Sequence, residues 1–122
     1  MVDHSYGLGV NNKTNDNLVT SLSYDYPSLQ LPAWNNGSAP IRNLDAQGST
    51  GYSTHNSWRE EIQRNAFDTL IVFFIKKDTL IKYGYNEQGY NVIRAGNNIA
   101  GYKFVTLDDL DNKGHNATVN YP

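Results

Sequence analysis

The sequence predicts a mainly β domain, an antiparallel β-sandwich of about six or seven strands with two or three short helices. Short apolar or alternating stretches recur along the chain, and turns containing Asn, Gly or Pro separate most of them. The connections are too short for the helical crossovers that a parallel sheet needs. The 122 residues fit one domain, 1–122, in which residues 1–6 are expected to form a frayed terminus.

The first predicted element is a β-hairpin. Residues 7–10 alternate between glycine and an apolar residue, and 18–26 alternate with period two, as a half-buried strand does. Residues 15–17 between them are typical of a turn, because Asn and Asp side chains bond to their own backbone. The alternation places Tyr24 and Tyr26 on the same face of the second strand.

The middle of the chain is predicted to be irregular. Residues 27–54 are polar and contain three prolines, so we expect a long loop in which only 41–44 could form a strand. After it, Ser57 and Glu60 form a capping box, in which each side chain bonds to the other residue's backbone amide. This pair predicts a short helix over 58–64.

The strongest predicted element is a central strand over 68–76. Its nearly continuous run of β-branched, leucine and aromatic residues indicates a strand that is covered on both faces. One helical turn is expected to start at 78–80. A second capping box, Thr106 with Asp109, predicts a short helix over 107–111. Three further strands are predicted: 90–93, 102–105 and 116–121.

The composition excludes several classes of function. The net charge is −2 and the Lys and Arg residues are scattered, so the chain lacks the basic patch of a nucleic-acid binder. It has no cysteine, which excludes a thiolate metal site and a cysteine nucleophile. No run approaches the roughly 20 apolar residues of a membrane span. The polar start at Met1 fits either a cytosolic protein or one without its export signal, and the Asn- and Tyr-rich composition favours the latter.

No metal or cofactor site is predicted. The three histidines lack a second ligand at helical or hairpin spacing; they are His4, His55 and His115. Residues 109–114 resemble a calcium loop, but Lys113 stands where an oxygen ligand belongs and Asn120 replaces the bidentate Glu. A lysine ammonium would repel the cation.

No catalytic residue is predicted either. Ser49 lies in a Gly-Ser-Thr-Gly sequence rather than in the Gly-x-Ser-x-Gly elbow of a serine hydrolase. Glu60 and Glu61 are neighbours on the predicted helix and point about 100° apart, so they cannot act on one substrate. A small hydrolase stays an alternative only if Ser, His and Asp side chains converge in space.

The aromatic residues supply the candidate binding site. Trp34 lies in the long loop beside Asn35 and Asn36, and Tyr24 and Tyr26 follow the second predicted strand. Flat rings stack on sugar faces or anchor protein partners. The alternative is that Trp34 anchors its loop to the core.

Several motifs together resemble one family. Asp-Thr-Leu occurs at 68–70 and again at 78–80, Thr-Leu-Asp-Asp-Leu at 106–110, and the chain ends in Thr-Val-Asn-Tyr-Pro at 118–122. With Tyr-Asp-Tyr-Pro at 24–27, these segments resemble a family of small uncharacterised lipoproteins of gut Bacteroides, over about two thirds of the chain. At 84–101 this chain is rich in Gly and Asn, where the family has a longer helix and a basic strand.

The resemblance implies export to the outer membrane or periplasm, with attachment through a lipidated cysteine upstream of Met1. It implies no enzymatic activity. Similar bacteria O-glycosylate Asp-Thr pairs that precede an apolar residue, a pattern that Thr69 and Thr79 match. The alternative is that these pairs serve as turn and capping residues.

The sequence therefore predicts a non-catalytic binding or assembly module of the cell envelope, which contacts another envelope protein. The alternative partner is a glycan, held by the exposed Trp and Tyr side chains.

Overall fold

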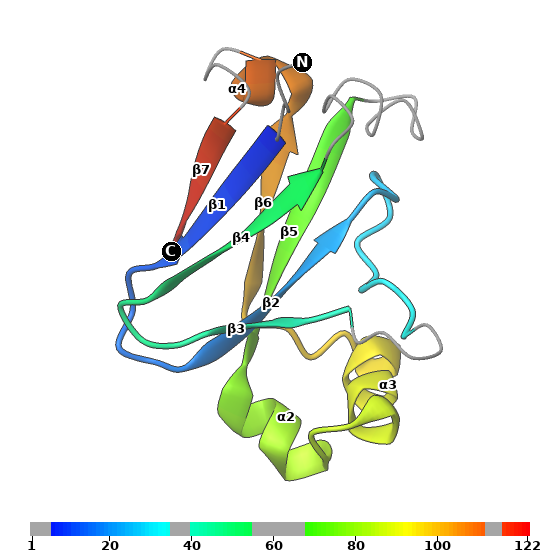
Figure 1. Ribbon diagram of the computed structural model, residues 1–122. Coiled ribbons are helices and arrows are strands. Elements are labelled where there is room, and N and C mark those ends of the chain that lie inside the picture. The colour runs from blue at the N-terminus through cyan, green and yellow to red at the C-terminus, as the bar shows by residue number, and fades with distance from the viewer. Residues whose placement is uncertain (1–5, 35–39, 55–67, 112–115) are drawn as a thin grey trace.

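The computed structural model describes residues 6–34, 40–54, 68–111 and 116–122, and here the mainly β, sandwich-like prediction is confirmed. The strands are β1 (Tyr6–Asn12), β2 (Leu18–Ser23), β3 (Arg42–Leu44), β4 (Ser49–Thr54), β5 (Thr69–Lys76), β6 (Gly101–Thr106) and β7 (Asn116–Tyr121). Figure 1 shows α2 (Lys77–Tyr83) and α3 (Glu87–Gly96) together at one end of the sheets and α4 (Leu107–Asp111) at the other.

The seven strands form two open sheets. The larger sheet has the order β3-β2-β5-β6 and is antiparallel throughout. The smaller has the order β4-β1-β7, in which β1 pairs antiparallel with β4 but parallel with β7. One sheet is therefore mixed, which corrects the prediction of a purely antiparallel sandwich.

The predicted hairpin of β1 and β2 is wrong, because the two strands lie in different sheets. The chain turns between them at Asn12, whose side chain is buried. Its Nδ2 donates to the carbonyl oxygens of Asp16 at 2.7 Å and Leu44 at 3.0 Å, and its Oδ1 accepts from the Thr14 N–H at 2.9 Å. The Asn12 N–H donates to the Gly48 carbonyl at 2.9 Å. Asn12 thus ties both crossings between the sheets, β1 to β2 and β3 to β4, to one corner.

The predicted central strand is confirmed. β5 lies between β2 and β6, and every residue from Thr69 to Ile75 is buried. One of its faces packs into an inter-sheet core and the other into a helix-side core beneath α2 and α3. The inter-sheet core contains Leu8, Val10, Leu18, Leu44, Leu70, Val72, Phe74, Val105, Leu107, Leu110 and Val119. The helix-side core contains Val19, Leu31, Ile71, Phe73, Ile75, Leu80, Tyr90 and Ile93.

β2 differs from its prediction in two ways. It ends at Ser23, and it is buried on both faces rather than one, because Leu18 enters the inter-sheet core and Val19 the helix-side core. Beyond the strand the chain no longer alternates, so Tyr24 packs against the inter-sheet core and Tyr26 against the helix-side core. The two tyrosines therefore do not share a face.

The strand predicted over 90–93 is wrong, because these residues lie in α3. Asn86 caps the start of the helix, where its side chain accepts a hydrogen bond from the Gly89 N–H at 2.9 Å. Asn97 caps the end and adopts the left-handed conformation with φ of 53°. The buried residues of α3 lie on one face of the helix, toward the larger sheet.

The other helices agree with their predictions. The turn expected at 78–80 lies within α2, and the helix expected over 107–111 is α4. The α4 capping box forms in both directions: the Asp109 N–H donates to Thr106 Oγ1 at 3.2 Å, and the Thr106 N–H donates to Asp109 Oδ2 at 3.1 Å. The helix predicted over 58–64, with its capping box, lies outside the described residues.

The predicted loop of 27–54 is wrong in its second half, which contains β3 and β4. β3 corresponds to the strand expected at 41–44, whereas β4 is an addition. β4 has a polar sequence, Ser-Thr-Gly-Tyr-Ser-Thr, and is placed by its backbone pairing with β1 from Ser49 to Thr54. The strands predicted at 102–105 and 116–121 are confirmed as β6 and β7.

Candidate functional site

The first candidate site is an aromatic strip, which we define as Tyr26, Tyr102 and Phe104. In the described ranges β6 is an edge strand of the larger sheet, and its side chains at 102 and 104 are 41% and 47% exposed. The ring centroids of Tyr102 and Phe104 are 5.3 Å apart. The Tyr26 ring meets the Phe104 ring edge-on at 5.2 Å. The three rings form one continuous surface.

The position of β6 explains why this surface is exposed. Tyr102 and Phe104 lie opposite Phe73 and Ile71 of β5, on the face that carries the helix-side core. Both β5 residues are fully buried, and the Tyr102 ring lies 6.4 Å from the Phe73 ring. The helix-side core thus ends at the border between β5 and β6. The Tyr102 and Phe104 rings continue the same apolar face of the sheet into solvent.

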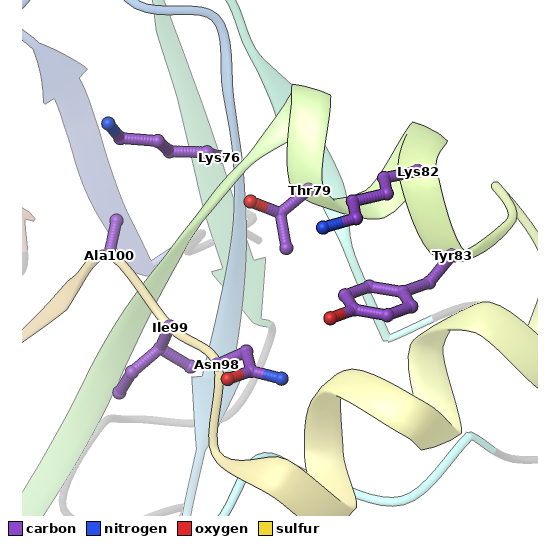
Figure 2. Close-up of a pocket in the computed structure, with 7 residues that line it drawn as sticks. All are labelled: Lys76, Thr79, Lys82, Tyr83, Asn98, Ile99 and Ala100. Carbon is purple, nitrogen blue, oxygen red and sulfur yellow. The ribbon is translucent and has the colours of Figure 1, made fainter.

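The second candidate site is a hollow between α2 and the segment that leads into β6, which we call the lysine pocket. Its volume is about 360 Å³, and it is lined by Lys76, Thr79, Lys82, Tyr83, Asn98, Ile99 and Ala100. Figure 2 shows Thr79, Lys82 and Tyr83 of α2 on one side of this space and Asn98 on the other. The pocket therefore presents ammonium, hydroxyl and amide groups.

The lysine pocket is positively charged. Of the described residues that line it, two are lysines and none carries a carboxylate. Lys76 Nζ lies 3.9 Å from Asp16 Oδ2, but both side chains are more than half exposed, so this pair is weak. Lys82 Nζ lies 5.6 Å from the centroid of the Tyr83 ring, a cation–π contact, and it forms no salt bridge with a described residue.

A third hollow, of about 370 Å³, opens beside the inter-sheet core and is lined by Leu22, Tyr24, Pro40, Ile41, Arg42 and Tyr52. The Arg42 guanidinium lies 5.0 Å above the Tyr52 ring. The Tyr52 hydroxyl is buried and has no hydrogen-bond partner within the described ranges. The Thr20 hydroxyl lies near it and donates to the Phe73 carbonyl at 2.9 Å. Burial raises the pKa of Tyr52 to about 12.

The structure does not gather the aromatic residues that the sequence suggested as a site. Tyr24 lines the third hollow and Tyr26 belongs to the aromatic strip. Trp34 packs against the helix-side core with its ring 5.6 Å from Tyr90, as the alternative interpretation expected. Asn35 and Asn36 lie outside the described residues.

The two threonines of the Asp-Thr-Leu motifs have different surroundings. Thr69 opens β5 and is buried, with 7% of its surface exposed. Thr79 is partly exposed in the lysine pocket. Of these two candidates for O-glycosylation, Thr79 is therefore the accessible one.

The histidines His4, His55 and His115 lie outside the described residues, as does the second half of the calcium-like segment, 112–114. Among the residues that are described, no three His, Asp or Glu side chains lie close enough together to hold a metal ion. None of the described helices has the length and apolar character that crossing a membrane requires.

Sequence reasoning missed Tyr102 and Phe104 as a site, although both lie on one face of a predicted strand. The signal that could have found them is two aromatic residues at period-two spacing around the polar Lys103. The lysine pocket has no such signal, because the packing of α2 against residues 98–100 creates it.

No family model matches the chain, and no curated protein or solved structure matches it either. The resemblance to Bacteroides lipoproteins stays a prediction.

Proposed function

We propose that this domain is a non-catalytic binding module and that its aromatic strip binds saccharides. The observation that carries the proposal is the exposure of two adjacent rings, Tyr102 and Phe104, at the edge of a sheet. Such rings stack on the apolar C–H face of a sugar, while the sugar hydroxyls stay in water.

The size of the strip favours a small ligand over a folded protein. A Tyr or Phe side chain offers about 150–250 Å² of surface, so the exposed parts of Tyr102 and Phe104 amount to on the order of 150–200 Å². A stable protein interface needs about 800 Å² on each partner. The strip alone therefore suits a saccharide of a few rings.

The side chains of the strip support binding rather than catalysis. Phenyl and phenol rings offer flat apolar faces for stacking and no paired acid and base. A role on the cell envelope, with a lipid anchor, is supported by the resemblance of the motifs at 68–70, 78–80 and 118–122. Labelling of native cells with a palmitate analogue, followed by membrane fractionation, tests that placement.

A second candidate function is docking of an envelope protein through the edge of β6. The described part of the larger sheet ends at this strand, so its outer backbone groups could pair with an extended peptide. Such a partner would extend the sheet by one strand and cover the strip at the same time.

Affinity electrophoresis and a glycan array test the proposed function. We expect wild-type protein to bind at least one glycan and Phe104→Ala to bind it at least tenfold more weakly, because a hot-spot ring contributes about 2 kcal/mol or more. Tyr85→Ala is the matched control: Tyr85 is 49% exposed but lies between α2 and α3, outside the strip, and its replacement should leave binding unchanged. Absence of binding to every glycan would refute saccharide binding and favour the protein partner.

A further inference from the structure

We propose that the saccharide held by the aromatic strip is acidic, and that the lysine pocket receives its charged group. This inference rests on the proposed function and deepens it by naming the ligand class. It joins two features that differ in chemistry: the rings of β6, and the pocket between α2 and residues 98–100, which lead into β6.

One edge of the pocket leads directly into the strand that carries the rings. Ala100 lines the pocket and Tyr102 belongs to the strip, so this edge lies two positions along the chain from the first ring. The Ala100 N–H donates to the Phe74 carbonyl at 2.7 Å, which continues the pairing of β6 with β5 beyond the strand itself. This backbone bond fixes residues 98–100, which line the pocket, beside the start of β6, and the proposed oligosaccharide would extend from the rings over this segment into the pocket.

The groups in the pocket are those that an acidic sugar needs. Lys82 and Lys76 supply positive charge, and no carboxylate is among the described lining residues, although the Lys76 ammonium lies 3.9 Å from the exposed Asp16 outside the pocket. The Thr79 hydroxyl and the Asn98 amide add neutral hydrogen-bonding groups around the same space, which suits the hydroxyls next to the acid (Figure 2). The volume of about 360 Å³ is within the range of small-molecule sites, about 300–1,000 Å³.

A neutral saccharide has no charged group that could pair with the lysine ammonium groups of the pocket. The net charge of the whole chain is −2, so its overall field does not attract anions, and any preference for an acidic ligand must come from local charge. Carboxylate and sulfate groups share the chemistry that the pocket recognises, namely a negative charge spread over several oxygens.

Isothermal titration with polygalacturonate, its methyl ester and chondroitin sulfate tests the inference. We expect wild-type protein to bind an acidic polymer at least tenfold more tightly than the neutral ester. That preference should shrink as NaCl is raised, because salt screens exposed charges. Lys76→Gln/Lys82→Gln should abolish the preference and leave binding of the ester unchanged.

The matched control is Lys13→Gln/Lys77→Gln, which also removes two positive charges. Lys13 is exposed in the turn after β1, and Lys77 pairs with Asp45 at 3.3 Å, so neither lines the pocket. This variant should keep the preference for acid. Circular dichroism checks that both variants are folded.

The outcomes separate the inference from the proposed function. Equal affinity for polygalacturonate and its ester overturns the inference while saccharide binding stands, as does an unchanged preference in Lys76→Gln/Lys82→Gln. If inorganic sulfate binds as tightly as the polymers, the pocket is a simple anion site, and the inference is again overturned. Failure to bind any of the polymers or any arrayed glycan overturns saccharide binding itself.

Discussion

β5 and β6 are paired neighbours in one sheet, and each carries two aromatic residues, yet they use them in opposite ways. Phe73 and Phe74 of β5 are fully buried, whereas Tyr102 and Phe104 of β6 are 41% and 47% exposed. The difference follows from position, because β5 has a strand on each side and a core on each face. Rings on the central strand hold the fold together, and rings on the edge strand are available to a ligand.

The largest effect expected is from removing a ring of β5. Phe74 lies in the inter-sheet core and stacks on Tyr121 of β7 with ring centroids 4.2 Å apart. Phe74→Ala should lower the free energy of unfolding by about 3–5 kcal/mol, since it leaves a cavity between the sheets. Urea denaturation measures this loss, and Phe74→Leu provides a milder variant if the alanine protein does not fold. A loss below about 1 kcal/mol would remove the distinction between the two strands.

The next effect is a loss of stability at alkaline pH. Burial raises the pKa of Tyr52 and of Tyr90 to about 12, whereas unfolded tyrosine ionises near pH 10. Between these values the unfolded chain releases protons that the folded chain retains, so stability is fully present below pH 10 and falls as the pH rises to about 12. Urea midpoints measured between pH 8 and 12 test this. Tyr52→Phe should flatten the decline, and an unchanged decline would contradict the assignment to Tyr52.

A smaller effect distinguishes the two buried tyrosines at neutral pH. The Tyr90 hydroxyl donates to the Pro32 carbonyl, so Tyr90→Phe should cost about 1–3 kcal/mol by leaving that carbonyl without its donor. The Tyr52 hydroxyl has no hydrogen-bond partner within the described residues, so Tyr52→Phe should be neutral or slightly stabilising. Thermal unfolding of both variants compares them, and equal losses would show that the Tyr52 hydroxyl has a partner too.

The smallest effect on stability is expected at the aromatic strip. Phe104→Ala removes contacts with Tyr26 and Tyr102 but opens no cavity, so it should cost less than about 1 kcal/mol. The same variant is expected to lose saccharide binding. A large loss of stability at Phe104 would mean that the strip is a part of the core and not a binding surface.

The sequence predicted those parts of the fold that depend on local chemistry. The apolar run of β5 and the capping box of α4 are readable from consecutive residues, and both are confirmed. The helical signals of α3 were also present, in the cap at Asn86 and the left-handed Asn97, and they outweigh the β-forming Tyr90 and Val92.

The predictions that failed concern features of the fold that depend on contacts between residues distant in sequence. The crossing that replaces the predicted hairpin needs Asn12 to meet Leu44 and Gly48, which no local pattern encodes. β4 is polar and is defined by its pairing with β1. For the candidate site, the alternation of Tyr102 and Phe104 was readable, but their exposure depends on β6 being at the edge of its sheet.

The parallel pairing of β1 with β7 has a consequence for synthesis of the protein. Asn11 Nδ2 donates to Asn120 Oδ1 at 3.0 Å across 109 positions, so β1 is made long before its partner β7. The core of the larger sheet, from β2 to β6, is complete once residue 106 has emerged from the ribosome. Because ribosomes add about 5–20 residues per second, β1 should spend seconds with one edge unpaired. We expect protease to cut β1 before β5 in nascent chains that carry a C-terminal extension and are stalled with residue 110 just outside the ribosome, and equal protection of both strands would contradict this order.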